Sequence, residues 1–363
     1  MSENVDREEL VSLVIKGKEW LFWDDMEITR SIDTHSTVGF SAPFEIDRKE
    51  FRETFRPFSY APLEVRVNGV PLFTGTMIDV VPKLDTDART VQVSAYSKAA
   101  ALEDCNIPAD NAPFEASGLS LRQIAERLAA PFGVSVAMTV RDPSKFKKVN
   151  TTRRTLDTKL ESDQKIQDFL GDLARQKGLV IGDTTRGDLL FQTSVAPGHP
   201  VARFVEGVPP LLSVTPTLNP QQYFTEVTGF RLAKRGSAGS AYTEKSRERI
   251  AGGVLRSLSF KLDDVEKADV PAAVRAHVGR MLAAAVSYVL VVPTWRDPRG
   301  ELWAPNTTLV LNAPSAFVYR DYEFLVRDVV FHQSRDERTA SLGLVMPGVF
   351  SQNALPKTRP WDE

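Results

Sequence analysis

Histidine and acidic side chains are the residues of this 363-residue chain that could carry acid–base or metal chemistry. The histidines are scattered, and none has a second histidine or a cysteine at the spacing that zinc-binding motifs require. We therefore predict surface or structural histidines, no bound metal and no cofactor. The four histidines concerned are His35, His199, His277 and His332.

Two acidic pairs, Asp24-Asp25 and Asp263-Asp264, are the candidates for the carboxylates of a hydrolase. A glycosidase needs two carboxylates that flank one bond. Adjacent residues of a strand point to opposite faces, so neither pair is expected to form a catalytic couple. The motif Gly-x-Ser-x-Gly, which marks a serine nucleophile, does not occur in the sequence. We predict that the chain is not an enzyme, and keep a cell-wall-degrading enzyme as a minor alternative.

Residues 141–155 hold a local basic cluster with Phe146 among its members. Such a cluster can contact nucleic acid or an acidic partner, although a solvated loop is the more common outcome. The net charge of −2 argues against a dedicated nucleic-acid binder. If the cluster has a function, we favour docking to a protein. Its members are Arg141, Lys145, Lys147, Lys148, Arg153 and Arg154.

Three tryptophans are candidate packing or interface residues. Trp295 and Trp303 flank Asp297-Pro298-Arg299-Gly300, whose residue types fit a type I turn. The segments on either side are rich in β-branched residues, so we predict a long β-hairpin here. The indoles are expected to pack against a helix or a subunit interface. Trp361 lies in a proline-containing tail and is a plausible anchor into a partner.

The bulk composition is that of an ordinary globular chain, with 42% hydrophobic and 25% charged residues. The single cysteine, Cys105, excludes an intrachain disulfide. The first nine residues are polar and acidic, unlike a signal peptide. No apolar run approaches the roughly 20 residues of a membrane helix. We therefore predict a cytoplasmically made protein with no membrane insertion by this chain.

The order of elements predicts an α+β, mainly β chain of several domains. Residues 1–9 are expected to be flexible. Residues 10–105 read as an antiparallel meander, with alternating Leu63, Val65 and Val67 before the turn Asn68-Gly69. Because open sheet edges invite mispairing, we expect this meander to close into a small barrel.

A small α+β domain is predicted over residues 106–200. Ser120 and Gln123 fit a capping box at the start of one amphipathic helix, and a second helix spans about 163–176. From residue 201 to 350 the chain returns to β character, with a packed helix over 269–286 and an exposed loop near 233–253. The final residues, 351–363, form a tail. The two β blocks could be structural cousins.

Three segments resemble the baseplate hub proteins of contractile phage tails. Leu72 to Asp79, followed by Val91 to Cys105, is similar to the first tube domain of the family. Residues 119–134 and 162–191 are similar to its middle domain, and Trp295 to Asn306 with Glu323 to Phe350 is similar to its second tube domain. The resemblance covers roughly residues 10–350. It is to the Mu-like hub and the T4-like central hub, which are related to the N-terminal hub region of type VI secretion spike proteins.

That resemblance implies a fold and a role. Two β-barrel-like tube domains would flank the α+β domain, and three subunits would form a ring with pseudo-sixfold symmetry. The protein would join a hexameric tail tube to a trimeric spike and line the channel through which DNA passes without sequence-specific binding. Its implied partners are itself, tube, spike and other baseplate proteins, and its place is the virion, assembled in the host cytoplasm. A hub of a secretion or injection particle without a genome is the alternative.

Overall fold

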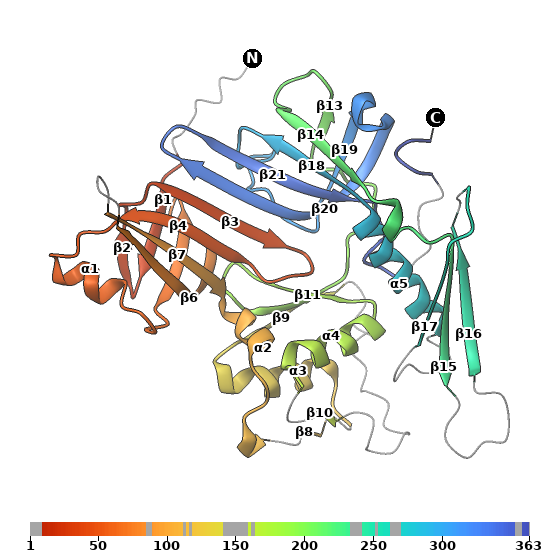
Figure 1. Ribbon diagram of the computed structural model, residues 1–363, viewed down its shortest axis with the longest axis horizontal. Helices are drawn as coiled ribbons and strands as arrows, with labels where there is room; N and C mark the ends of the chain where they lie inside the picture. Colours follow the sequence, from red (N-terminus) through yellow and green to blue (C-terminus); the bar gives the residue numbers. More distant parts are fainter. Residues whose placement is uncertain are drawn as a thin grey trace.

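The computed structural model describes residues 9–84, 89–111, 114–115, 118–140, 159–160, 164–232, 242–250, 253–261, 270–352 and 358–362. The chain is mainly β with some helices, as the sequence predicted. Its largest feature is one sheet of 13 strands that runs across the upper part of Figure 1. Strands from near both ends of the chain meet in this sheet, because β20 (Val318–Ser334) pairs with β3 (Asp25–Ser31).

The spatial order of the sheet is not the order of the sequence. The β20–β3 pair divides the sheet into two groups of strands. The strands on the β20 side come from the C-terminal part of the chain, and those on the β3 side come from the N-terminal part. In order, the strands of the sheet are β14 (Ser213–Leu218), β18 (Val286–Val292), β21 (Arg338–Val345), β20, β3, β4 (Thr37–Pro43), β7 (Arg89–Ser97), β6 (Val70–Leu84), β5 (Pro62–Val67), β1 (Val11–Ile15) and β2 (Lys18–Trp20). Two further strands, β19 (Thr308–Ala313) and β13 (Arg203–Val205), extend from the first half of β20.

Period-two alternation explains why these segments form one sheet with a buried side. Along β7, Val91, Val93 and Ala95 are buried as predicted, while Gln92 and Ser94 between them are exposed. The same alternation continues through the neighbouring strands, and the buried positions merge into the main core. The large side chains of that core include Met26, Ile28, Phe40, Tyr288, Leu290, Phe331, Leu342 and Leu344.

The expected closed barrels are not what the described residues form. The hydrogen-bonded path of the sheet is open, with β14 at one end and β2 at the other. The sequence argument assumed that each meander protects its edges by closing on itself. Instead, β3 and β20 cover one another's edges over seven residue pairs, from Asp328 opposite Ser31 to Ser334 opposite Asp25. The two β blocks are therefore joined side by side.

A second core lies beneath the sheet, in the lower part of Figure 1. Helix α3 (Leu121–Ala129) begins with the predicted capping box, because the Ser120 side chain accepts from the Gln123 amide and the Gln123 side chain accepts from the Ser120 amide. Helix α4 (Ile166–Gln176) packs beside it. Their apolar faces cover a three-stranded sheet of β11 (Val180–Asp183), β12 (Leu189–Gln192) and β9 (Val136–Thr139).

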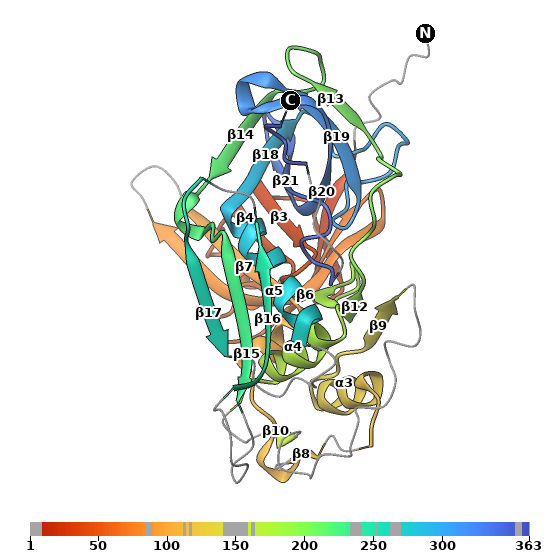
Figure 2. The same ribbon diagram turned by 90° about the vertical axis from the view of Figure 1, so that its right-hand side faces the viewer.

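Four short elements connect this block to the large sheet or lie at the margins of the two. Helix α1 (Lys49–Thr54) packs Phe51 against Trp20, with ring centroids 4.7 Å apart. Helix α2 (Ala101–Asp104) follows β7 directly. Strands β8 (Phe114–Glu115) and β10 (Lys159–Leu160) pair with each other at the bottom of Figure 2.

The segment predicted as an exposed loop near 233–253 contains a strand, so that part of the prediction was wrong. Strand β16 (Tyr242–Arg249) pairs antiparallel with β15 (Glu226–Leu232), and β17 (Ser257–Lys261) pairs with β15 on the other side. Charged residues dominate β16, which hid its strand character. Helix α5 (Val270–Ala285) packs against this small sheet, as Figure 2 shows. Residues 233–241 lie outside the described part of the chain.

The predicted long hairpin around Asp297 was right at the turn and wrong in its strands. The Gly300 amide donates to the Asp297 carbonyl at 2.9 Å, as a type I turn requires, and Arg296 bridges to Leu302. The flanking strands do not pair with each other. Strand β18 lies between β14 and β21, whereas β19 lies between β13 and β20. Local turn chemistry cannot specify these distant partners.

Candidate functional site

One side of the large sheet is covered by the core, and the other carries small polar and acidic side chains across eight strands. We call these strands the first β unit (β3, β4, β7 and β6) and the second β unit (β20, β21, β18 and β14). Strand register places side chains of both units in rows on the uncovered side. One row is Thr215, Val289, Gly343 and Asp328, and another is His332, Glu27, Gly39, Ser94 and Asp79. We call this side the polar face.

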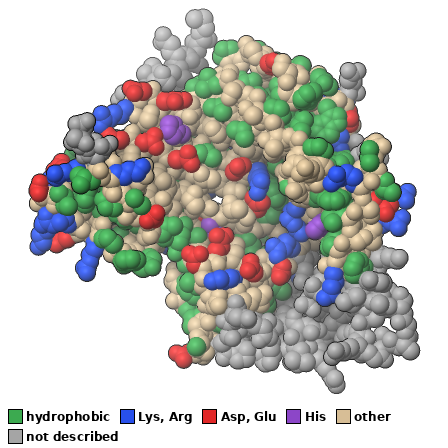
Figure 3. Space-filling model, viewed as in Figure 1, with side chains coloured by type: hydrophobic (Ala, Val, Ile, Leu, Met, Phe, Trp, Pro, Cys, Tyr) green, Lys and Arg blue, Asp and Glu red, His purple; other side chains and the backbone are tan. Residues whose placement is uncertain are grey.

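The polar face is acidic and almost free of fixed positive charge. Its described carboxylates in register are Asp25, Glu27, Asp79 and Asp328, and Lys83, near the free end of β6, is the one lysine or arginine among these described positions in register. Arg327, the extra residue at the irregularity of β20, is paired with Asp33. Figure 3 shows mainly acidic and uncharged side chains over β3, β20 and β21, with one histidine and one lysine or arginine near β20. Such a surface has few fixed cations with which to bind a polyanion.

Two interactions fix the middle of this face at the seam between the units. His332 of β20 lies 3.0 Å from the Asp25 carboxylate of β3, measured from Nε2 to Oδ2. Asp328 lies directly opposite Gly343, and burial raises the pKa of Asp328 above its ordinary value. A Cβ at Gly343 would come within 1.8 Å of Asp328 Oδ2. Only glycine leaves room for this carboxylate.

Buried polar contacts attach the α+β block to the seam. The Ser36 amide and hydroxyl donate to the Asp183 carboxylate at 2.8 and 2.7 Å. Asn306, which precedes β19, donates from Nδ2 to Gln192 Oε1 at 2.9 Å. Arg327 and Asp33 pair at 3.2 Å between the two β units themselves. Charge-assisted bonds of this kind are strong when they are shielded from water. The contacts of Ser36 and Asn306 hold the block beside the seam, beneath the sheet in Figure 1.

Trp295 and Trp303 are buried inside the chain, at 1% and 2% exposure. The Trp295 indole donates to the Thr339 carbonyl at 2.8 Å and packs against Phe331, with ring centroids 5.2 Å apart. Trp303 donates to the Thr294 carbonyl at 3.0 Å. Both indoles therefore act in packing within this chain. Trp295 anchors the turn around Asp297 to β20 and β21, whereas Trp303 ties the two flanks of the turn together and packs near Phe204 of β13.

Trp361 is half-buried and packs against the main core. Its segment is held by backbone bonds: the Tyr319 amide donates to the Pro360 carbonyl at 3.3 Å, and the Tyr322 hydroxyl donates to Thr358 at 3.3 Å. This part of the tail thus lies along the beginning of β20. The predicted basic cluster, Arg141 to Arg154, lies outside the described residues.

The described residues bring no catalytic or metal-binding cluster together. No group of three or more histidine, cysteine or acidic residues has a geometry that could hold a metal ion within the described ranges. Asp25 contacts His332, Asp24 contacts Arg335, and Asp263 and Asp264 lie outside the described part of the chain. The described helices include none long and apolar enough to cross a membrane.

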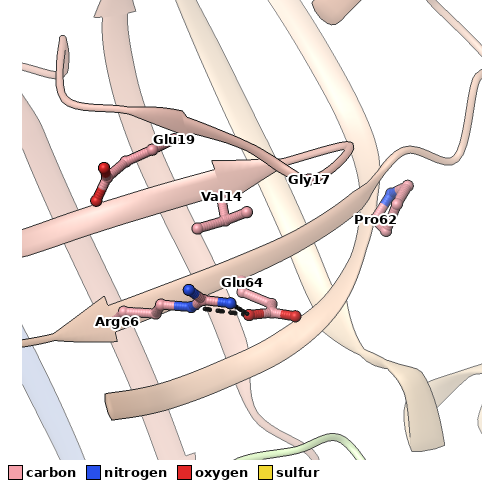
Figure 4. Close-up of a pocket in the computed structure, with 6 residues that line it drawn as sticks. All are labelled: Val14, Gly17, Glu19, Pro62, Glu64 and Arg66. Carbon is pink, nitrogen blue, oxygen red and sulfur yellow. Dashed lines mark hydrogen bonds and ion pairs between the residues drawn. The ribbon is translucent and has the colours of Figure 1, made fainter. Parts of the chain in front are cut away.

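A shallow cavity of about 280 Å³ lies on the outer surface of β1, β2 and β5. Figure 4 shows Glu19 and Glu64 on either side of Val14, and Arg66 beside Glu64. The Arg66 guanidinium donates to the Glu64 carboxylate at 2.7 and 3.0 Å. Because Glu64 is already neutralised, this surface does not present a free pair of carboxylates to a substrate.

The comparisons with known proteins agree with this architecture. Residues 99–193 match the second domain of gp44-like baseplate hub proteins. The baseplate hub protein gp44 of Escherichia phage Mu is 23% identical over 332 residues, which are 88% of this chain and 83% of that protein.

Two solved structures share the fold over almost their whole length. The 43 kDa tail protein of prophage MuSo2 from Shewanella oneidensis has a TM-score of 0.75 at 22% identity, covering 93% of this chain and 98% of that one. The tail protein from Neisseria meningitidis MC58 has a TM-score of 0.77 at 18% identity, covering 96% and 99%. The resemblance seen in the sequence is therefore confirmed: this chain is similar to the gp44-like baseplate hub proteins, and its residues 99–193 match the second domain of that family.

Proposed function

We propose that the protein is a structural component of the phage tail, the baseplate hub, and that it assembles as a homotrimer around a central channel. It has no catalytic role in this proposal. Residues 10–105 and 201–350 supply the two tube domains, and residues 106–200 form the domain between them. The ring joins the tail tube to the central spike in the assembled virion.

The observation that carries the proposal is the polar face. It runs without interruption across both β units, because β3 and β20 join them into one sheet. A surface that lines a DNA channel must avoid tight phosphate contacts, which lysine and arginine would make. The acidic and small polar residues of this face meet that requirement. The face therefore supports a channel wall better than it supports a binding or catalytic cleft.

The remaining candidate residues take secondary roles in this proposal. Trp295 and Trp303 stabilise the second tube domain from within, because both are buried. Trp361 and the basic cluster from Arg141 to Arg154 are the candidates for docking to the spike or to other baseplate proteins. An aromatic anchor and a basic patch are the usual partners of an apolar pocket and an acidic surface, respectively.

The solution mass of the purified protein, with negative-stain images of the same peak, tests the ring. A mass of three chains and a particle with a central hole are expected. A monomer without a hole would contradict self-assembly of the free protein, and addition of the candidate spike then shows whether the partner induces the ring. If no ring forms even with the spike present, the proposal of a homotrimeric ring is wrong. Packaged DNA in the purified particle separates a virion from a secretion particle without a genome.

A further inference from the structure

The α+β block and the large sheet have separate buried cores, and hydrogen bonds join the two. The core of the block includes Leu102 of α2, so α2 belongs to the block. Across the joint, the Thr74 hydroxyl donates to the Thr185 carbonyl at 2.9 Å, and the Gln192 side chain donates to the Ile32 carbonyl at 3.3 Å. Interfaces between units of one chain permit relative motion unless they are large and hydrophobic. The firmness of this joint therefore depends on its polar contacts.

His35 is a buried titratable residue on the sheet side of this joint. It lies in the turn between β3 and β4, and its side chain is 2% exposed. Neither ring nitrogen has a hydrogen-bond partner among the described residues. Buried polar atoms are normally paired, because an unpaired donor or acceptor costs free energy. The imidazole thus lacks the contact that its burial requires.

One carboxylate faces this imidazole from the block. Glu103 of α2 places Oε1 3.7 Å from His35 Nε2, just beyond hydrogen-bond distance. In the described part of the chain, Glu103 makes no other ion pair or hydrogen bond. Helix α2 lies directly beneath the sheet in Figure 1. A small movement of α2 or of the imidazole ring is enough to close this gap.

A cavity of about 280 Å³ gives the pair access to water. It lies between α4, β11, α5 and the segment after β21, and its lining residues include Glu103 and Asp33. Gln167 of α4 also lines it, and the side-chain oxygen of Gln167 is buried without a partner among the described residues. A cavity of this size with polar walls accommodates ordered water. Glu103 therefore connects the buried imidazole to a route for protons.

The other carboxylates close to the turn already have partners. Asp33, in the same turn, pairs with Arg327 of β20 at 3.2 Å. Asp183 of β11 accepts two hydrogen bonds from Ser36 and attracts Arg30 of β3. Glu103 is therefore the carboxylate that remains available to a protonated His35. The further charged groups on the elements around the turn and the cavity are Lys98, Asp104, which is hydrogen-bonded to Tyr96, Asp168, Arg175, which is paired with Asp172, and Arg280.

We propose that His35 and Glu103 form a proton-operated latch between the large sheet and the α+β block. When the imidazole gains a proton, Nε2–H donates to the Glu103 carboxylate and the block is held more firmly. Hydrogen bonds between two charged groups are shorter and stronger than neutral ones. When the imidazole is neutral, the joint relies on its other polar contacts. The latch is a property of the single chain and does not depend on the proposed ring.

The two side chains set the pH range in which the latch is closed. Free histidine and glutamate side chains titrate near pH 6.5 and about pH 4.3, respectively. Both partners are charged between these values, so the latch is closed at roughly pH 5–6. Because the protonated imidazole is the form that pairs, the stabilisation is present at low pH and is lost as the pH rises through neutrality. Protonation of the carboxylate removes it again below about pH 4.

NMR titration of the histidine ring signals in the full chain tests the pair. The chain has four histidines, so the His35 signal is assigned by elimination, with its buried side chain left intact. The variants for this assignment are His199→Gln, His277→Gln and His332→Gln.

Glu103→Gln should move the midpoint of the His35 titration to lower pH by about one pH unit, because it removes the charge that favours the imidazolium. Asp168→Asn is the matched control, since that carboxylate lines the same cavity at an exposed position of α4. It should leave the midpoint where it is in the unaltered protein. A midpoint that Glu103→Gln does not move would overturn the latch.

Amide hydrogen exchange tests whether the pair holds the block to the sheet. After correction for the intrinsic effect of pH, amides of α2 and β11 should exchange roughly tenfold more slowly at about pH 5.5 than at about pH 8. Glu103→Gln should abolish this difference, and Asp168→Asn should preserve it. The His332–Asp25 pair also responds to pH, but it is present in both variants and so does not affect the comparison. A moved midpoint with no effect of Glu103→Gln on exchange would overturn the latch, because the pair would then titrate without holding the block.

Discussion

The absence of a side chain at Gly343 leaves the space that the Asp328 carboxylate occupies on the neighbouring strand. The carboxylate of Asp328 occupies the space where any other residue at 343 would place its Cβ. Gly39, on the same polar face, has nothing within 4 Å of the corresponding position. Both glycines are strand residues with ordinary backbone angles, so the sequence alone does not separate them. Only the pairing of β20 with β21 does.

We expect Gly343→Ala to lower the free energy of unfolding by about 1–3 kcal/mol, because the methyl group forces the Asp328 side chain away. Gly39→Ala is the matched control. It should be neutral or stabilising by up to about 1 kcal/mol, since alanine has less backbone entropy to lose. Urea unfolding of both variants measures the difference. Equal stability of the two variants would show that Asp328 moves without cost.

Elements with a local signal were predictable from the sequence, and elements set by distant partners were not. The Asn68-Gly69 turn, the capping box of α3 and helix α5 were found because their determinants lie within a few residues. Strand β16 was missed because its charged sequence becomes a strand only beside β15. The two segments that flank the Asp297 turn were predicted to pair with each other, because the sequence shows the turn between them and does not show their distant partners.

The turn around Asp297 acts as a clamp on two strands, and Trp295 is its central contact. The indole packs on Phe331 of β20 and donates to the Thr339 carbonyl of β21. We expect Trp295→Ala to cost about 3–5 kcal/mol of unfolding free energy, the range for a buried aromatic residue. Trp361→Ala is the comparison and should cost clearly less, because that indole is half-buried. Chemical denaturation followed by far-UV circular dichroism measures both. A similar loss for both would mean that the tail is as important as the clamp.

The arrangement of the whole molecule was the hardest part to predict. The sequence indicated β, α+β and β segments in that order, and its balanced charge permitted a channel lining that is polar and not strongly basic. It did not indicate which residues form the polar face, because that face is assembled from strands near both ends of the chain. Closed barrels were expected because each β block was considered alone. The edges that such barrels would have hidden are instead used to join the blocks.

Charge on the polar face is the property that the channel proposal depends on. We expect Ser94→Lys to leave assembly intact and to lower infectivity, because the added cations, repeated around the ring, hold DNA phosphates during passage. Ala130→Lys adds the same charge at an exposed position after α3 and serves as the control. Plaque titre and DNA ejection from purified particles measure the effect. Normal titre for Ser94→Lys would count against a channel lined by this face.

The seam between β3 and β20 also has a consequence for synthesis on the ribosome. Arg327 and Asp33, which pair across it, are 294 residues apart in the chain. At about 5–20 residues per second, β3 waits roughly 15–60 s for the strand that covers its edge. During that time its protection comes from its own side chains, and Asp25, Glu27 and Arg30 supply charges that discourage pairing with other nascent chains. The same acidic residues that make the finished face polar thus also guard the unfinished chain against aggregation.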